Sequence, residues 1–143
     1  MKIIQVILVV LLILMKNSEA RIGETREQCE QRYGKSLGSK DSYVIYHKND
    51  YDIVVHFYND YADQIVYDKP NHEPFSDREV KTLLEINSYE REWKYIGNNS
   101  WTTAGRELHA GRSKTTLAIW TAEYAKREDK KKEGEDNKKL DGL

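Results

Sequence analysis

This sequence is poor in the residues that cross-link or interrupt a chain, with one cysteine and two prolines among 143 residues. A single cysteine, Cys29, excludes an intramolecular disulfide. It leaves two readings, a reactive or intermolecularly bridged thiol and a small buried side chain. We predict the buried side chain, because Cys29 lies four residues before Tyr33 and both then share one face of a helix.

The chain also lacks an excess of either charge, with 23 basic and 24 acidic residues. This balance argues against a nucleic-acid partner, because proteins that bind nucleic acids present basic surfaces to the phosphates. Charged residues make up 33% of the sequence, so we expect a small core and a heavily solvated surface. Ten tyrosines and three tryptophans then supply much of the large apolar area.

No apolar run reaches the about 20 residues that a transmembrane helix needs. The run Ile3–Met15 follows Lys2 and precedes Ser18-Glu19-Ala20, which together form the pattern of a secretory signal with a small-x-small cleavage site. We therefore predict a signal peptide at residues 1–20 and a secreted or periplasmic protein without an integral membrane span. The alternative is that the signal stays uncleaved and anchors the chain.

After the signal, the sequence predicts one α+β domain over residues 21–125, with possible halves 21–69 and 75–125. The first half should hold a short helix between the capping box Thr25-x-x-Gln28 and Gly34. A three-stranded antiparallel meander should follow. Its strands are expected at Tyr43–Lys48, Tyr51–Tyr58 and Gln64–Asp68.

The link Asn49-Asp50 fixes the register of the first two strands, because both residues tolerate the positive φ of a tight hairpin. Tyr46 then lies opposite Ile53, and one face of the hairpin is apolar and should be the core face. That face carries Val44, Tyr46, Ile53, Val55 and Phe57. The facing of the third strand depends on the loop at Asn59-Asp60 and stays open.

The second half begins after a linker, residues 69–74, that holds both prolines. A second capping box, Ser76-x-x-Glu79, starts a helix that should end at Asn87 or Ser88. Further short antiparallel strands should follow, at Trp93–Ile96, Trp101–Thr103, Leu108–Ala110 and Thr115–Thr121. A C-terminal helix from Ala122 should follow. Residues 126–143 should form its charged, solvated end and then a disordered tail, because this segment has almost no apolar residues.

The opening motif resembles a known family. Gly23-x-Thr25-x-x-x-Cys29-x-x-x-Tyr33-Gly34-x-Ser36 has the spacing that opens the SmpA/OmlA (BamE-like) family of small outer-membrane lipoproteins, and of similar modules related to β-lactamase-inhibitor proteins. Cys29, Tyr33 and Ser36 replace the aliphatic residue, Leu and Pro of that pattern, and the lipid-bearing cysteine is absent. The resemblance implies a helix followed by a meander, and it implies that the domain binds other proteins through a sheet face.

A second resemblance is to a group of small, secreted, functionally uncharacterised bacterial proteins. It rests on the run Arg21-Ile22-Gly23-Glu24-Thr25 to Tyr33-Gly34 and on Leu117-x-Ile119-x-Thr121.

Candidate site residues lie on the face of the hairpin opposite the predicted core. Tyr43, His47, His56 and Tyr58 share this face and form the candidate partner-binding set, because tyrosine is enriched in interfaces. The alternative is that the second half of the chain covers this face and buries them. We predict no metal site and no cofactor, since His47 and His56 lie about 13 Å apart by strand rise, too far to share one ion.

Three functions remain open at this point. The first is an exported, non-enzymatic protein-binding domain with an unknown protein partner, and the second is a purely structural envelope component. The third is a small secreted hydrolase, for which Glu107 and His109 are the candidate catalytic pair. We favour the first, because the chain lacks a convincing catalytic constellation.

Overall fold

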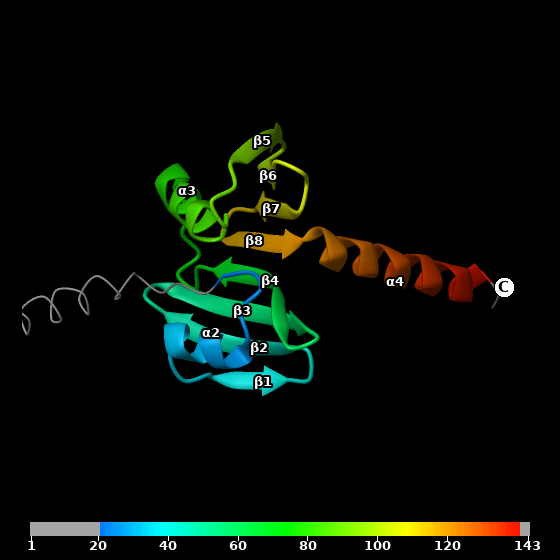
Figure 1. Ribbon diagram of the computed structural model, residues 1–143, viewed down its shortest axis with the longest axis horizontal. Coiled ribbons are helices and arrows are strands. Elements are labelled where there is room, and N and C mark those ends of the chain that lie inside the picture. The colour runs from blue at the N-terminus through cyan, green and yellow to red at the C-terminus, as the bar shows by residue number, and fades with distance from the viewer. Residues whose placement is uncertain (1–20, 141–143) are drawn as a thin grey trace, which may run out of the picture.

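A computed structural model describes residues 21–140 and shows one antiparallel sheet of eight strands with helices packed against it (Figure 1). In chain order the elements are α2 (Arg26–Tyr33), β1 (Gly38–Lys40), β2 (Tyr43–Lys48), β3 (Tyr51–Tyr58), β4 (Tyr61–Asp68), α3 (Asp77–Ile86), β5 (Trp93–Gly97), β6 (Ser100–Thr103), β7 (Leu108–Arg112), β8 (Thr116–Thr121) and α4 (Ala122–Leu140). The strands lie in the order β1-β2-β3-β4-β8-β7-β6-β5. The predicted signal, residues 1–20, lies outside the described residues.

The prediction of a three-stranded meander followed by separate short strands is wrong, although the α+β class is broadly right. β4 pairs with β8 from Gln64↔Trp120 to Asp68↔Thr116, and this pairing merges the two sets of strands into one sheet. The first set also has a fourth strand, β1, which pairs with β2. Its sequence, Gly-Ser-Lys, has no apolar alternation that would have indicated a strand.

The two halves of the chain repeat the same order of elements. The first half has α2 followed by β1–β4, and the second half has α3 followed by β5–β8. The last strand of each half lies at the centre of the sheet, where β4 and β8 pair. The two halves of the chain are therefore a repeat of architecture.

Both predicted helix starts are confirmed. The Thr25 and Ser76 hydroxyls each accept a hydrogen bond from the backbone N–H three residues later, at 3.3 Å. The side chains of Gln28 and Glu79 accept in return from the backbone N–H of the capping residue. Each helix therefore begins where its capping box lies, because the box satisfies donors that would otherwise lack a partner.

The hairpin register is also confirmed, with Val44 opposite Val55 and Tyr46 opposite Ile53. All five residues predicted for the core face are buried. The pairing of β3 with β4 shifts after His56, and Asp63 is the extra residue, so Ile65 and Tyr67 face the same side as Val55 and Ile53. This settles the facing of β4.

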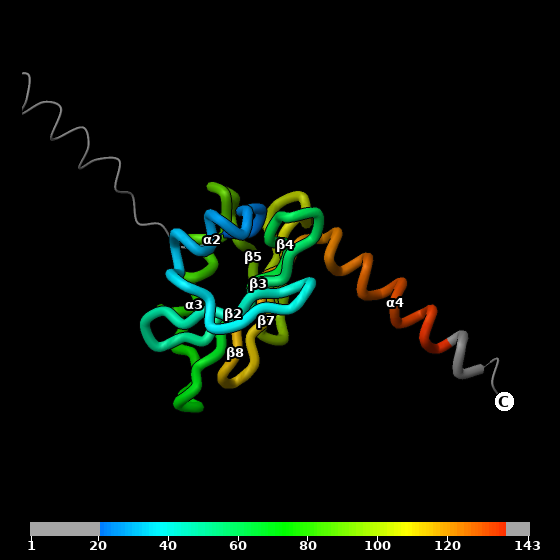
Figure 2. The backbone as a smooth tube through the Cα atoms, turned by 90° about the horizontal axis from the view of Figure 1, so that it is seen from below, coloured from blue at the N-terminus to red at the C-terminus, as the bar shows by residue number. Residues whose placement is uncertain are grey.

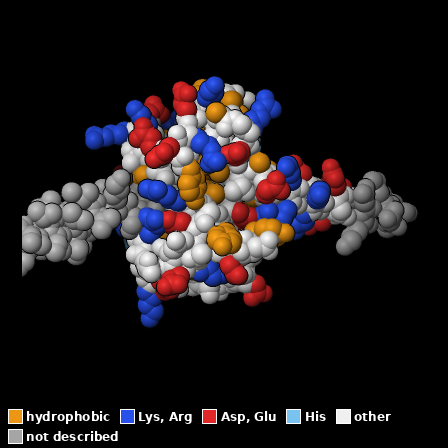
Figure 3. Space-filling model, in the orientation of Figure 1, with side chains coloured by type: hydrophobic (Ala, Val, Ile, Leu, Met, Phe, Trp, Pro, Cys, Tyr) orange, Lys and Arg blue, Asp and Glu red, His pale blue; other side chains and the backbone are white. Residues whose placement is uncertain are grey.

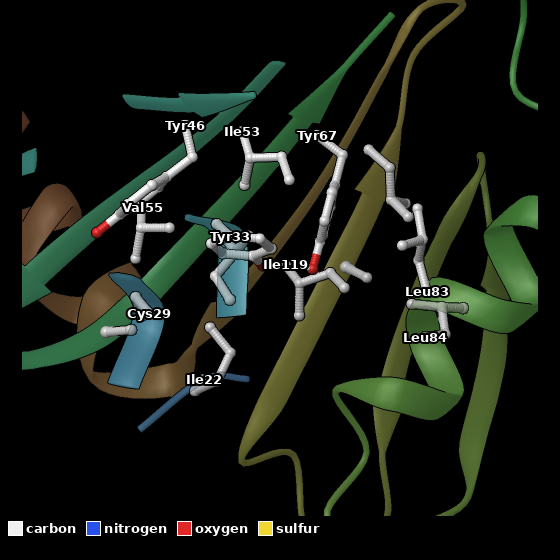
Figure 4. Packing of buried hydrophobic residues seen from close by; sticks show 14 of the residues in the cluster. Ile22, Cys29, Tyr33, Tyr46, Ile53, Val55, Tyr67, Leu83, Leu84 and Ile119 are labelled. Atoms are coloured by element: carbon white, nitrogen blue, oxygen red, sulfur yellow. Dashed lines mark hydrogen bonds between the residues drawn. The ribbon is translucent and has the colours of Figure 1, made fainter. Parts of the chain in front are cut away.

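α2 and α3 pack against the same side of the sheet (Figure 4). Cys29 and Tyr33 of α2, and Leu83 and Leu84 of α3, join one cluster of buried residues with the strands. Cys29 is fully buried, in agreement with its prediction. The second half of the chain thus extends the sheet sideways, and on the opposite side the start of α4 contacts the strands, where Tyr124 lies beside His56.

A partly buried ion pair links α3 to the first half. Lys69 Nζ lies 2.7 Å from Glu79 Oε1, and the Tyr51 hydroxyl of β3 donates to the same oxygen at 2.9 Å. Burial alone raises the pKa of Glu79, but the hydrogen bonds from Lys69 and Ser76 outweigh burial and lower this pKa to about 2. The start of α3 is therefore held against β3 and the end of β4.

The last helix, α4, extends away from the rest of the molecule (Figure 2). It continues to Leu140, so the charged helix end expected after residue 126 extends over most of residues 126–143. Opposite charges at helical spacing, such as Glu123 and Lys126 (2.7 Å), provide local stabilisation that composition alone did not indicate. Within the described residues, no helix has both the length and the apolar character needed to cross a membrane.

Candidate functional site

The side of the sheet opposite α2 and α3, which we call the open face, carries a continuous row of side chains across all eight strands. Neighbouring residues in this row are direct cross-strand partners, and strands are about 4.8 Å apart, so the row is roughly 34 Å long. Its members are Lys40, Tyr43, His56, Gln64, Trp120, His109, Thr102 and Lys94. The six inner members are half-buried, which leaves each of them accessible.

A second row runs parallel to the first and is small or apolar along its length. It consists of Gly38, Ile45, Val54, Val66, Ala118, Gly111, Ser100 and Gly97. A Cβ atom at Gly111 would lie 3.3 Å from Trp120 Cη2, so the indole ring extends over this glycine. The open face therefore combines an aromatic and polar row with an apolar one.

The four residues predicted to bind a partner are all on the open face, but the structure brings only two of them together. The Tyr43 and His56 rings lie 5.4 Å apart as cross-strand partners. His47 lies further along the hairpin, where its Nδ1 is 2.8 Å from Asp52 Oδ1. Tyr58 lies under the Arg127 guanidinium, which is 3.8 Å from its ring centroid.

The start of α4 limits the open face at the β3–β4 end. Tyr124 lies edge-on to His56, with ring centroids 6.2 Å apart, and Arg127 forms an ion pair with Asp63. Burial lowers the pKa of His56, and nearby Glu128 partly opposes this effect. His56 is thus held against α4 in a state that favours the neutral imidazole.

Sequence reasoning missed Trp120, His109 and Gln64 as neighbours of Tyr43 and His56. The local signals for the first hairpin reach only to β4, and Trp120 joins the row through the pairing of β4 with β8. A weak signal was present in the alternation of Ala118 and Trp120 against Leu117 and Ile119. This alternation indicated a second face without showing which residues would share it.

The candidate hydrolase pair, Glu107 and His109, is not assembled in the structure. Glu107 precedes β7 and its Oε2 lies 2.6 Å from Arg91 Nη2. The His109 ring is stacked on Trp120, with centroids 6.2 Å apart. Over residues 21–140, no group of three or more His, Cys, Asp or Glu side chains is arranged to hold a metal ion.

A second surface, which we call the aromatic groove, lies on the helix side of the sheet between α3 and strands β5 and β6. Its volume is about 710 Å³. Figure 3 shows hydrophobic side chains exposed among charged ones over the half of the molecule that carries β5. Six residues of the groove lining define it: Val80 and Leu84 of α3, Trp93 and Tyr95 of β5, Trp101 of β6, and Arg112 of β7.

We found no family model, no curated protein and no solved structure that matches this chain. The kinship with SmpA/OmlA modules remains a hypothesis that rests on the spacing from Gly23 to Ser36. The function is therefore inferred from the geometry of the open face and the aromatic groove.

Proposed function

We propose that this chain is an exported, non-enzymatic domain that binds another protein through its open face. The observation that carries the proposal is the row from Lys40 to Lys94, which crosses the whole sheet on the side opposite α2 and α3. A sheet with one face packed on helices has no structural need for aromatic side chains on the other face. Two such side chains, Tyr43 and Trp120, lie in the row.

The side-chain types of the open face suit a protein partner. Tyr43 and Trp120 offer large rigid area at low entropic cost, and both can bury further surface because both are half-buried in the free chain. His56 and His109 add ring nitrogens beside them, whereas Gln64 and Thr102 make hydrogen bonds within the chain, to Tyr124 and to the Leu108 carbonyl. The neighbouring apolar row, from Ile45 to Ala118, would form the dry centre of such an interface.

The extent of the open face also fits. A stable interface buries about 800 Å² on each partner. A row of roughly 34 Å with a second row beside it spans a surface of that order. We propose a folded partner, because a broad face with two adjacent rows can be covered by another surface and would be covered only in part by a single extended peptide.

Export is part of the proposal and rests on the pattern at Lys2, Ile3–Met15 and Ser18-Glu19-Ala20. The relevant partner is therefore sought among proteins outside the cytoplasm. The hydrolase alternative has weaker support, because Glu107 and His109 each have a different neighbour, Arg91 and Trp120.

The test places a photo-crosslinking amino acid at Tyr43 and, as a control, at Arg78, an exposed position on α3 on the other side of the sheet. A protein captured from the exported fraction at position 43 and absent at position 78 is then purified and its affinity measured. Tyr43→Ala and Trp120→Ala should each weaken this affinity roughly 30-fold, as truncation of a hot spot commonly costs about 2 kcal/mol. Tyr95→Ala, on the opposite side of the sheet, should leave it unchanged.

A stability measurement separates binding from folding. Tyr43→Ala should lower the free energy of unfolding by less than about 1 kcal/mol, because this side chain is only half-buried. A loss of about 3 kcal/mol or more would identify Tyr43 as a core residue. That result, or capture of the same protein at both positions, would contradict the proposal.

A further inference from the structure

We infer that the aromatic groove beside α3 is a second binding site, which takes the free carboxyl end of an extended, apolar peptide. This site is independent of the proposed function, because it lies on the helix side of the sheet. The groove has an aromatic floor that the fold leaves partly exposed, and an arginine is held at one end of that floor.

The floor of the groove consists of aromatic side chains that α3 covers only in part. Tyr95 is 61% exposed, and its ring lies 5.3 Å from that of Trp101. Trp93 is fixed in place, since its Nε1 donates to the Leu84 carbonyl at 2.6 Å. Preformed aromatic surface of this kind gains from covering by apolar ligand groups, because little ordering of the side chains is needed on binding.

Arg112 supplies the anion-binding end of the groove. Its guanidinium lies 5.8 Å from the Trp101 ring centroid. Nη1 donates to Asp77 Oδ1 at 2.7 Å and Nη2 donates to Asn99 Oδ1 at 3.0 Å. The guanidinium is thus oriented by two acceptors and presents a fork that matches a carboxylate.

The Asp77 carboxylate marks where a ligand carboxylate can bind. The Asp77 side chain is 95% exposed, whereas that of Arg112 is 22% exposed. An ion pair with so exposed a partner contributes little to stability. A ligand carboxylate can therefore replace Asp77 on Arg112 at small cost, while the rest of the ligand covers the aromatic floor.

The charges of the groove give the ligand a direction. Lys81 is engaged with Glu85 on α3, and Arg91 with Glu107. Glu92 precedes Trp93 and so lies at the end of β5 remote from Asn99 and Arg112. Because Asp77 places a carboxylate at the Arg112 end as well, the direction rests on Arg112 itself, whose partly buried guanidinium is held by Asn99 and stands against Trp101.

The dimensions suit about four peptide residues. The groove follows α3, whose ten residues span about 15 Å. Four extended residues span about 13 Å. The volume of about 710 Å³ is within the range of sites for ligands of this size.

The three tryptophans provide the readout, because two line the groove and Trp120 lies on the open face. The probe is an acetylated Ala-Ala-Val-Phe peptide with a free carboxyl terminus, and its matched control is the same peptide with a terminal amide. By NMR, the acid should shift the indole N–H signals of Trp93 and Trp101 and leave that of Trp120 in place. The amide should bind roughly tenfold more weakly or worse, because it lacks the charge that Arg112 recognises.

Two substitutions with opposite expected signs complete the test. Arg112→Gln should reduce the affinity of the acid to that of the amide, whereas the adjacent exposed cation variant Lys114→Gln should have little effect. Asp77→Asn should raise the affinity for the acid several-fold, because it removes the competing carboxylate from Arg112. Equal binding of acid and amide, a shift of Trp120 alone, absence of binding, or an unchanged affinity in Asp77→Asn would each overturn the inference.

Discussion

The two halves of this molecule have the same order of elements but differ in how far their helices bury the tyrosines on the helix side of the sheet. In the first half, Tyr46 of β2 is on the helix side of the sheet and is 2% exposed. In the second half, Tyr95 of β5 is on the same side and is 61% exposed. One half has therefore formed a closed core, while the other has kept an open groove.

The difference follows from where each helix lies. α2 packs on β2, and Tyr33 lies 5.2 Å from the Tyr46 ring. α3 is tied to the first half through Glu79, which binds Lys69 and Tyr51. Its buried side chains accordingly lie near the centre of the sheet and leave β5 and β6 partly uncovered. The position of α3, held at its start by Glu79 and along its length by buried side chains, thus leaves the edge strand β5 largely exposed.

The largest expected effect is on the pair of tyrosines that defines this comparison. Tyr46→Ala should lower the free energy of unfolding by about 4 kcal/mol, since it leaves a cavity in a packed core. Tyr95→Ala should lower it by less than about 1 kcal/mol, because most of this side chain is already in water. Urea unfolding of both variants checks the difference, and equal losses would show that the second half is as closed as the first.

The next effect concerns the ion pair that positions α3. Glu79→Ala leaves the buried Lys69 without its carboxylate and removes the Glu79 half of the capping box while the Ser76 cap stays in place, so a loss of about 2 kcal/mol is expected. Glu85→Ala is the control, because Glu85 is exposed and pairs with Lys81 at 3.8 Å, and it should change stability by less than about 0.5 kcal/mol. Denaturant titrations of the two variants provide the measurement.

The same carboxylate predicts a dependence on pH. The pKa of Glu79 is lowered to about 2 from the ordinary 4.5. Its contribution is therefore fully present above about pH 4.5 and is lost as the pH falls from 4.5 toward 2, since the unfolded chain takes up the proton first. Thermal melts of Glu79→Gln should be less sensitive to pH across this window than melts of the unsubstituted protein, and identical slopes would contradict the assignment.

The smallest effect is expected at Cys29. Burial, with the nearby Glu24 carboxylate, raises the pKa of this thiol to about 12, so it should not react with thiol reagents in the folded state. Cys29→Val should cost less than about 1.5 kcal/mol, because valine fills similar space. Labelling kinetics with and without denaturant check the first statement, and rapid labelling of the folded protein would disprove it.

The local parts of the fold were predictable from the sequence. Two capping boxes placed the starts of α2 and α3, and the tight turn at Asn49-Asp50 fixed the register of β2 and β3. These signals work because each interaction joins residues only a few positions apart. The same hairpin register placed Tyr43 and His56 opposite each other on one face of the sheet.

The long-range parts were not predictable. The pairing of β4 with β8 depends on edges that any two antiparallel strands offer, so nothing in Gln64 or Trp120 specifies the other as a partner. To predict the groove, the position of α3 relative to Trp93 and Trp101 must be known. The periodicity of the sequence does not give this position. The length of α4 was not predicted, because the polar composition of this segment does not reveal stabilising charge pairs such as Glu123–Lys126.

The seam between β4 and β8 also imposes an order on folding. Even the pair of this seam that lies closest in the sequence, Asp68 and Thr116, is 48 positions apart, so the seam closes a far longer loop than either hairpin beside it. During synthesis, the outer edge of β4 stays unpaired until β8 has been made. Its apolar residues Ile65 and Tyr67 are exposed to wrong partners for that interval. The pairing of β4 with β8 gives the folded protein an open face across all eight strands. Until that pairing forms, the partly synthesised chain is the form most prone to aggregation.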